Sequence, residues 1–193
     1  MSVLSAYLIG INALGFLVAL IACKRATEES HAVSDVLLSV MSILGGTVGI
    51  ALALLAFYRK AEKATMMPRV CVACMIVIQA VVVLVMRGHI AQHITLNFFE
   101  FVSGKPILLI YLILVDLLTI IAFAVDKHAA LKSNRRVKIV TLLVLAYCGG
   151  TVGALLGMYL FRHKTNKNYF YLGIPLMLIM QVIVLWYAMN WAW

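Results

Sequence analysis

GGTVG, at residues 45–49, occurs a second time at residues 149–153, which lie 104 positions further along the chain. The residues around it repeat with the same offset: from 33 to 63, 13 of 31 positions are identical to their counterparts. Further upstream, the offset aligns Asn12 with Asp116. A repeat of this length indicates a tandem duplication, so we expect the chain to consist of two homologous units.

The chain is far more apolar than a soluble protein. Hydrophobic residues make up 65% of it and charged residues 12%, with a mean hydropathy of +1.06, whereas a soluble domain is about 45–50% apolar and about 25% charged. In lipid, a run of about 20 apolar residues satisfies its backbone hydrogen bonds as a helix. The sequence therefore predicts an all-α polytopic integral membrane protein with about six transmembrane helices. The six apolar stretches are 3–22, 34–57, 70–86, 106–125, 139–161 and 170–193.

The predicted helices fall into two homologous repeats of three. The first repeat covers 1–87 and the second covers 106–193, and the connector 88–105 is expected to contain a short interfacial helix. Three crossings per repeat would leave the second repeat inverted relative to the first. Inverted repeats are a recurrent plan of secondary transporters, whose substrate sites lie at the repeat interface. This arrangement favours a transport protein.

The basic residues leave an alternative topology open. Six spans divide the 16 Lys and Arg residues nine to seven between the two sides, which decides little under the positive-inside rule. If each GGTVG segment were a re-entrant hairpin, 14 of the 16 would share the cytoplasmic side. A glycine at every fourth position is nevertheless typical of a continuous helix packed closely on a neighbour, so we favour six spans. The glycines expected to pack helices together are Gly45, Gly46, Gly49, Gly149, Gly150, Gly153 and Gly157.

The second repeat carries a recognisable pattern. It reads FAVDKHAA at 123–130, GGTVGALLGM at 149–158 and FRHKTNK at 161–167, followed by Phe170. Over about 112–187 it resembles a bacterial membrane family of unknown function, domain-of-unknown-function family 1294. The first repeat looks like a degenerate copy, because it has lost the Asp-Lys pair and the HKT stretch. The resemblance implies a multi-pass protein of the bacterial or archaeal inner membrane and no known reaction.

Asp116 is the most unusual residue of the chain, because it lies within the apolar run LILVDLLTI. A carboxylate in the middle of a membrane helix costs about 2.5–3.5 kcal/mol and is a functional candidate by default. Asn12 occupies the equivalent position in the first repeat. We therefore expect the two side chains to lie near each other at the membrane midplane. The alternative for Asp116 is a structural hydrogen bond between helices.

A basic cluster follows the apolar run that ends at Phe161. Such a cluster can bind phosphate or an anionic headgroup, because Arg forks onto phosphate oxygens and Lys adds point charge. The alternative is an ordinary basic anchor at a helix end. Asp126 and Lys127 either belong to the same site or form an interfacial charge pair worth under about 1 kcal/mol. Besides Asn12 and Asp116, the substrate- or lipid-binding candidates are Asp126, Lys127, Arg136, Arg162, His163, Lys164 and Lys167.

Several classes of function find no support in the sequence. The GxSxG and HExxH signatures and a phosphate-binding glycine loop are absent, which leans against an enzyme without excluding one. His89 and His93 are spaced for one helix face but lack a third ligand, so we expect no metal and no cofactor. The net charge of +9 fits loops that touch membrane lipids, chiefly anionic ones, rather than nucleic acid. A homo-oligomer stays open.

Three functions remain, in order of preference. The first is a carrier or channel-like protein for a small ion or metabolite, with Asp116 and Asn12 at the midplane. The second is a protein that binds lipid headgroups at the cytoplasmic face, or an enzyme that acts on them. The third is a non-catalytic membrane scaffold. The hairpin topology would favour the second, because one surface would then hold Lys127, Arg136, His163 and Lys164.

Overall fold

The protein is helical throughout the part of the chain that the structure describes. In the computed structural model, every regular element within these residues is a helix, which confirms the predicted all-α membrane class. The chain divides into two compact units, Met1–Ala80 and Val81–Trp193. The predicted repeat borders at 87 and 106 stay predictions. The described residues are 3–24, 31–57, 66–91, 94–132 and 137–191.

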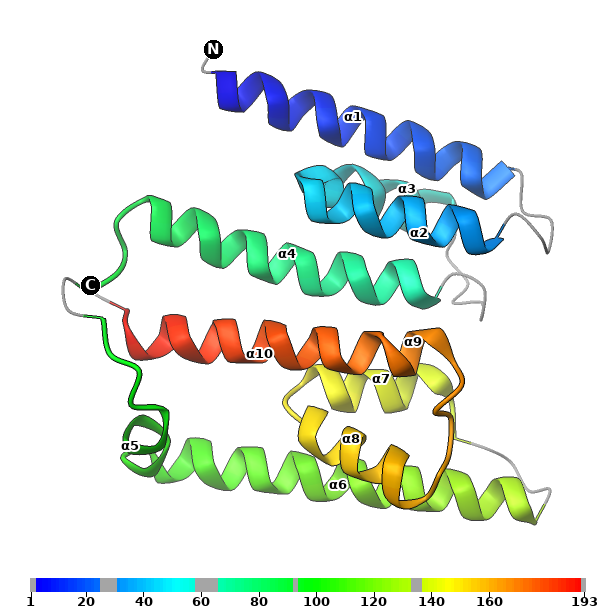
Figure 1. The fold of residues 1–193 in the computed structure, drawn as a ribbon, viewed down its shortest axis with the longest axis vertical. Helices are drawn as coiled ribbons and strands as arrows, with labels where there is room; N and C mark the ends of the chain where they lie inside the picture. Colours follow the sequence, from blue (N-terminus) through cyan, green and yellow to red (C-terminus); the bar gives the residue numbers. More distant parts are fainter. Residues whose placement is uncertain (1–2, 25–30, 58–65, 92–93, 133–136, 192–193) are drawn as a thin grey trace. The chain divides into compact units, whose positions relative to one another are not determined.

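Unit 1 consists of a long helix, a broken helix and the greater part of a second long helix (Figure 1). Its α1 and α3 pack against each other, and α2 also contacts α1. Small and branched apolar side chains fill the space between these helices: Ala19, Leu38, Ile50, Ala53, Leu54 and Val72 are buried together. The elements are α1 (Val3–Lys24), α2 (His31–Met41), η1 (Ser42–Gly46), α3 (Thr47–Phe57) and α4 (Met66–Met86).

Unit 2 begins within the last turns of α4 and is built around α6. Pro106 occupies the first turn of α6, where its missing N–H costs no hydrogen bond. The aromatic core joins α6 to α9, because the rings of Phe123 and Phe170 meet edge to face with centroids 5.7 Å apart. The elements are α5 (Phe98–Ser103), α6 (Pro106–Leu131), α7 (Ile139–Tyr147), α8 (Thr151–Leu160), α9 (Asn168–Tyr171) and α10 (Gly173–Met189).

The connector contains the expected short helix, α5, and is tied to the end of α10. Asn190 is buried, and its Oδ1 accepts a hydrogen bond from the Thr95 backbone N–H at 2.7 Å. Its Nδ2 donates to the Thr95 carbonyl at 3.1 Å, and its own carbonyl accepts from Ala91 N–H at 2.7 Å. No sequence pattern around Asn190 indicates this role. The position of α5 at a membrane interface stays a prediction.

Four helical stretches among the described residues are long and apolar enough to cross a membrane, by length and composition. Two further apolar stretches are Ala6–Ala22, which lies within α1, and the shorter helix Thr151–Leu160. The predicted number of six spans is therefore not confirmed. The four long stretches are Val36–Phe57, Met66–Met86, Pro106–Leu131 and Asn168–Met189.

The stretch 139–161, predicted as one span, is instead a helical hairpin. Gly149, between α7 and α8, has φ 124°, a backbone conformation that glycine adopts without strain. The Val137 N–H before α7 and the His163 ring after α8 both contact the Asp126 carboxylate, at 3.0 and 2.8 Å. A straight helix would hold residues 137 and 163 about 39 Å apart, because the rise is about 1.5 Å per residue. The hairpin therefore opens at the end of unit 2 where α6 ends (Figure 1).

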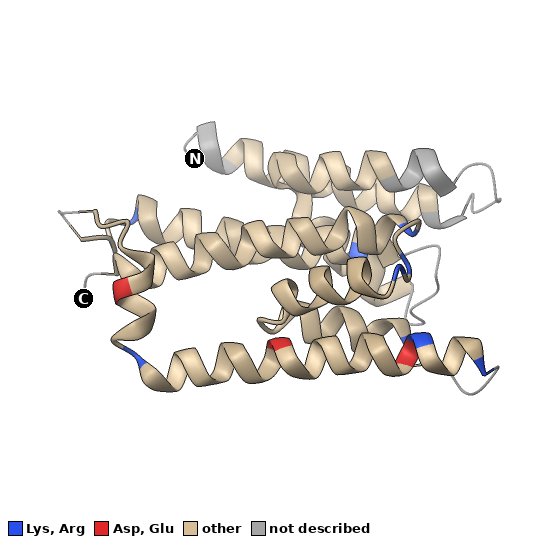
Figure 2. Ribbon diagram, turned by 60° about the horizontal axis from the view of Figure 1, so that its bottom comes forward, with Lys and Arg blue, Asp and Glu red and all other residues tan. Residues whose placement is uncertain are grey.

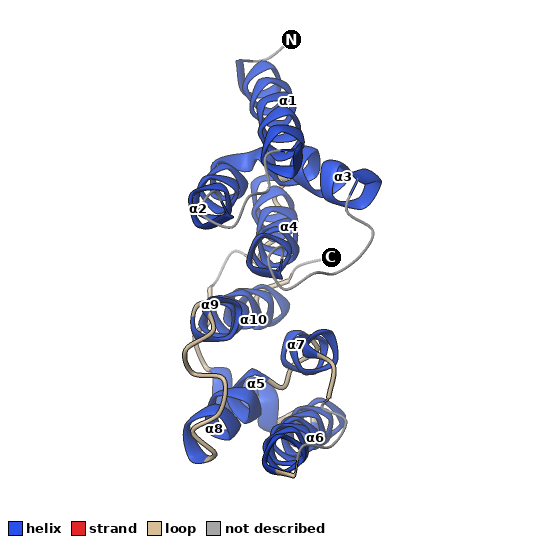
Figure 3. Cartoon of the chain, turned by 90° about the vertical axis from the view of Figure 1, so that its right-hand side faces the viewer, coloured by secondary structure: helices blue, strands red, loops and turns tan. Residues whose placement is uncertain are grey.

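The stretch 34–57 is broken in the same way at the first GGTVG segment. Gly45 has φ 111° and ψ 0°, which is not helical, and α3 turns back from α2 at this point (Figures 1 and 3). The chain thus reverses within Val36–Phe57, although this stretch is long enough for one crossing. Both GGTVG segments are thus turns between two helices, so the prediction of a continuous glycine-lined helix is wrong. That each hairpin enters and leaves the membrane on one side stays a prediction. Gly45 and Gly149 turn the chain, and an added Cβ at either would meet its neighbours only in ordinary contact.

The third glycine of each GGTVG segment allows two backbones to touch. A Cβ added to Gly49 would overlap the backbone carbonyl of Asn12, and one added to Gly153 would overlap that of Asp116. Helix α3 therefore packs on α1, and α8 packs on α6, at a distance that excludes any side chain. Gly46, Gly150 and Gly157 are also confined, with neighbours at 3.0 Å or closer to an added Cβ.

Replacing Gly153 with Ala should destabilise the protein by about 2–3 kcal/mol, because the backbone of α6 must move away to admit a methyl group. Gly10→Ala is the matched control, since a Cβ at Gly10 has nothing within 4 Å. It should be neutral or stabilise by up to about 1 kcal/mol. Thermal unfolding of the purified protein in detergent measures both. Equal behaviour of the two variants would contradict the close approach of α8 and α6.

Candidate functional site

Asp116 and Asn12 each complete the start of a neighbouring helix. Asp116 Oδ1 accepts a hydrogen bond from the Gly153 N–H at 2.7 Å, and Asn12 Oδ1 accepts from the Gly49 N–H at 2.9 Å. Gly153 and Gly49 are the third residues of α8 and α3, and the N–H groups of a first helical turn have no partner within their own helix. Asp116 and Asn12 cap these N–H groups from the adjacent helix, which explains why a polar residue stands within each apolar run. The expected proximity of Asn12 to Asp116 stays a prediction.

Further polar contacts hold the two hairpin turns, and they involve equivalent groups in each. A tyrosine hydroxyl of the preceding helix donates to a carbonyl just before the first glycine: Tyr7 to Leu44 at 2.8 Å, and Tyr111 to Cys148 at 2.5 Å. A glutamine of the following helix binds the threonine of GGTVG and a carbonyl of the helix before the turn. These bonds are Thr47 to Gln79 at 2.5 Å, Gln79 to Ser42 at 3.1 Å, Thr151 to Gln181 at 2.5 Å and Gln181 to Ala146 at 2.8 Å.

Asp126 is the centre of a second polar cluster, at the open end of the α7–α8 hairpin. Its side chain is completely buried, and its Oδ2 lies 2.6 Å from Lys164 Nζ and 2.8 Å from His163 Nε2. Its Oδ1 accepts the Val137 N–H at 3.0 Å. One carboxylate therefore binds the end of α6 to the start of α7 and to the loop after α8. The pair with Lys127 that the sequence suggested is wrong: the Asp126 ion pair is made with Lys164, and His163 contacts the same oxygen.

The loop after α8 adopts a costly backbone conformation to place these two side chains. Arg162 has φ 44° and Lys164 has φ 63°, a left-handed region that costs about 1–2 kcal/mol for a residue with a Cβ. His163 N–H bonds to Met158 O at 3.1 Å and Arg162 N–H to Tyr159 O at 3.3 Å, a Schellman arrangement that usually employs glycine. Strain of this kind concentrates at functional sites. The cluster of Asp126, His163 and Lys164 is therefore the candidate site.

Two aromatic rings, those of Phe170 and Phe123, pack next to this site. Lys164 Nζ is 5.1 Å from the centre of the Phe170 ring, a cation–π distance. Phe170 is completely buried, and so is Phe123 beside it. Lys164 thus reaches Asp126 across an apolar surface. The side chain of Lys164 is 16% exposed and that of His163 is 17% exposed. Both side chains remain accessible from outside.

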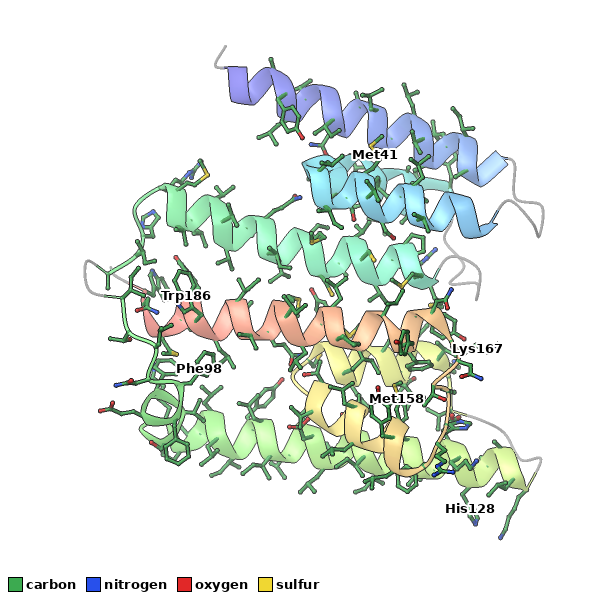
Figure 4. All side chains as sticks on the ribbon, in the orientation of Figure 1. Met41, Phe98, His128, Met158, Lys167 and Trp186 are labelled. Carbon is green, nitrogen blue, oxygen red and sulfur yellow. The ribbon has the colours of Figure 1, made fainter. Side chains whose placement is uncertain are left out.

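Further basic residues gather around the site and define what we call the basic end of unit 2. Among the described residues, Lys127 is half-buried there, while Arg162 and Lys167 are exposed. Figure 2 shows the cationic residues at the end of α6 and in the loop after α8, and Figure 4 shows His128 and Lys167 at the same end of the unit. Arg136 lies outside the described residues. The basic end comprises Lys127, Lys132, Lys138, Arg162, Lys164 and Lys167, with Asp126 as the carboxylate among them.

The other ionic groups of unit 2 lie elsewhere. Arg87, Glu100 and Lys105 flank the connector and α5, at the opposite end of α6. Among the described residues, no group of three His, Cys, Asp or Glu side chains could hold a metal ion. His89 belongs to the connector, and His93 lies outside the described part of the chain.

These features define a helical membrane protein in which a buried carboxylate secures a hairpin and a basic loop. Residues 116–170, which begin at Asp116 and end at Phe170, match the family model described as "Protein of unknown function (DUF1294)". The chain is also 35% identical over 75 residues to the uncharacterised protein YsdA of Bacillus subtilis (strain 168), covering 39% of this chain and 84% of that protein. No solved structure matches the chain. The chain therefore belongs to the DUF1294 family, as the motifs of the second repeat predicted.

Asp116→Asn should be tolerated, because the asparagine keeps an Oδ1 that can accept the Gly153 N–H, as Asn12 does for Gly49. Asp116→Leu removes that acceptor and should cost about 1–3 kcal/mol, since it leaves a helix N–H unpaired. Thermal unfolding of the two variants in detergent measures the difference. A loss of stability as large for Asn as for Leu would show that the capping account of Asp116 is wrong.

Proposed function

We propose that this protein binds the phosphate-bearing headgroups of anionic membrane lipids at the basic end of unit 2. The observation that carries the proposal is the double use of Asp126: it holds His163 and Lys164 in place and brings both ends of the α7–α8 hairpin together. The loop residues on either side of the hairpin thereby become one basic surface.

The charges of that surface favour an anionic ligand. Lys164 offsets the charge of Asp126, and among the described residues the other Lys and Arg residues of the basic end form no ion pair with a carboxylate. Arg162 and Lys167 are exposed there. Guanidinium groups bind phosphate oxygens in pairs and lysines add point charge. Anionic lipids of the cytoplasmic leaflet supply such phosphates beside any membrane helix.

The same distribution of charge supports an orientation. Cytoplasmic loops carry an excess of Lys and Arg, and in unit 2 that excess lies at the basic end rather than beside Arg87 and Lys105. We therefore propose that the basic end faces the cytoplasm of a bacterial cell and that α6 and α10 cross the inner membrane. The α7–α8 hairpin would then enter and leave on the cytoplasmic side.

A tandem duplication is part of the proposal. The GGTVG segments lie 104 residues apart, and the capping, tyrosine and glutamine contacts of the two hairpins involve equivalent groups. The 75 matched residues make up 84% of the Bacillus protein, so that relative is about as long as one unit. With the same offset, Ala22 stands in unit 1 where Asp126 stands in unit 2. We therefore assign the headgroup site to unit 2 alone.

The carrier that the sequence favoured loses its main argument. An inverted repeat requires an odd number of crossings in each unit, and the hairpin removes one crossing from unit 2. Asp116, the residue proposed for the midplane, already serves as the partner of the Gly153 N–H. No described contact of Asp116 or Asn12 requires a substrate.

Replacing Arg162 and Lys167 together with Gln should weaken the binding of phosphatidylglycerol. Each cation near an anionic membrane surface contributes about 1 kcal/mol, so the apparent affinity should fall about 30-fold. Arg87→Gln with Lys105→Gln is the matched control, since it removes the same charge from the opposite end of α6. Native mass spectrometry of the purified chain, titrated with phosphatidylglycerol in a zwitterionic detergent, measures the bound lipid.

The control pair should bind nearly as well as the unchanged protein. Equal losses in both pairs would indicate a general effect of charge and overturn the assignment to the basic end. An unchanged protein that retains phosphatidylglycerol no better than phosphatidylcholine would leave the scaffold as the better account.

A further inference from the structure

His163 contacts Asp126 through one of its two ring nitrogens, Nε2. Its Nε2 lies 2.8 Å from Asp126 Oδ2, and Lys164 Nζ pairs with that oxygen at 2.6 Å. A carboxylate accepts hydrogen bonds, so the ring nitrogen that faces it carries a hydrogen. In the neutral ring the other nitrogen, Nδ1, then has a lone pair and accepts a proton. The side chain is 17% exposed, so the ring reaches the surface of the basic end.

The surroundings of the ring are fixed. Among the described titratable side chains of unit 2, Asp126 contacts His163 directly and Lys164 shares its oxygen. The carboxylate orients the imidazole as it does in many histidine sites, where the bond to one nitrogen determines the chemistry of the other. The two left-handed residues that flank His163, Arg162 and Lys164, hold the loop in the required shape.

We infer that the basic end selects phosphate monoesters over phosphate diesters, because a monoester can give its P–OH proton to His163 Nδ1. This rests on the headgroup binding proposed above. The proton leaves the phosphate oxygen and joins Nδ1, so the ligand becomes a dianion and the ring becomes an imidazolium. Asp126 stabilises the imidazolium through Nε2. Arg162, which precedes His163, and Lys167, four residues after it, are both exposed and supply the positive charge that binds the dianion.

A diester headgroup cannot take part in this exchange. Its phosphate has a single charge and no P–OH, so the phosphate meets the Nδ1 lone pair of the neutral ring with another acceptor and transfers no proton to it. A phosphate monoester, in contrast, has a second ionisation with a pKa of about 6, and its proton is easily transferred near neutral pH. The chemistry fits both phosphatidic acid and a soluble monoester, and the experiment has to separate them.

Isothermal titration calorimetry of the full chain in a zwitterionic detergent provides the test. The ligands are dihexanoyl phosphatidic acid, dihexanoyl phosphatidylglycerol and glycerol 3-phosphate, at one pH and ionic strength. The monoester lipid should bind the unchanged protein about tenfold more tightly than the diester, as one added charge-assisted hydrogen bond provides. In His163→Gln the preference should disappear, because the amide of Gln takes up no proton. His128→Gln, at an exposed histidine of the same end, should retain it.

The outcomes separate the two proposals. Equal binding of both lipids by the unchanged protein would overturn the selection and leave headgroup binding intact, whereas no binding of either lipid would overturn both. A preference that survives in His163→Gln would also overturn the role of the ring. If glycerol 3-phosphate binds as tightly as phosphatidic acid, selection for monoesters stands and the ligand is a soluble phosphate ester; much weaker binding assigns the site to the lipid.

Discussion

The structure of unit 2 depends on one buried carboxylate. Asp126 is reached by Val137 from the start of α7 and by His163 and Lys164 from the loop after α8. Burying a carboxylate is costly unless it is paired and hydrogen-bonded, and removing a partner from a buried pair costs about 3–5 kcal/mol. The three contacts satisfy this requirement, and they oblige both ends of the hairpin to meet at the end of α6. The basic surface is a consequence of that closure.

The two carboxylates of α6 have different tasks. Asp116 accepts the Gly153 N–H at the start of α8, where the close approach of the glycine leaves no room for a side chain at position 153. Asp126 binds Lys164 and His163, whose side chains remain partly exposed. The first holds the closed end of the hairpin against α6, and the second holds its open end. The second also holds the partly exposed side chains of His163 and Lys164, which is why the proposed chemistry lies there.

The helical class and the family could be predicted from the sequence, because long apolar runs and the HKT stretch are local signals. The hairpins could not be predicted from the glycines, because glycines at 149, 153 and 157 suit one continuous packed helix as well as a turn that precedes a packed helix. The spacing of these glycines does not reveal the positive φ of Gly149. The distribution of basic residues did point to the hairpins. Lys127 was a misleading partner for Asp126, since neighbouring residues of a helix face directions about 100° apart, and the true partner, Lys164, is distant in sequence.

The most direct test is the sidedness of the hairpin. Single cysteines at Lys138 and Asn166, which precede α7 and follow α8, would be introduced into a chain without its own cysteines, with Ser103→Cys before α6 as the reference. A membrane-impermeant thiol reagent should label position 103 in intact bacterial cells, and positions 138 and 166 only after the cells are opened. Labelling of 138 and 166 from opposite sides would mean that 139–161 crosses the membrane, and would contradict the closure at Asp126.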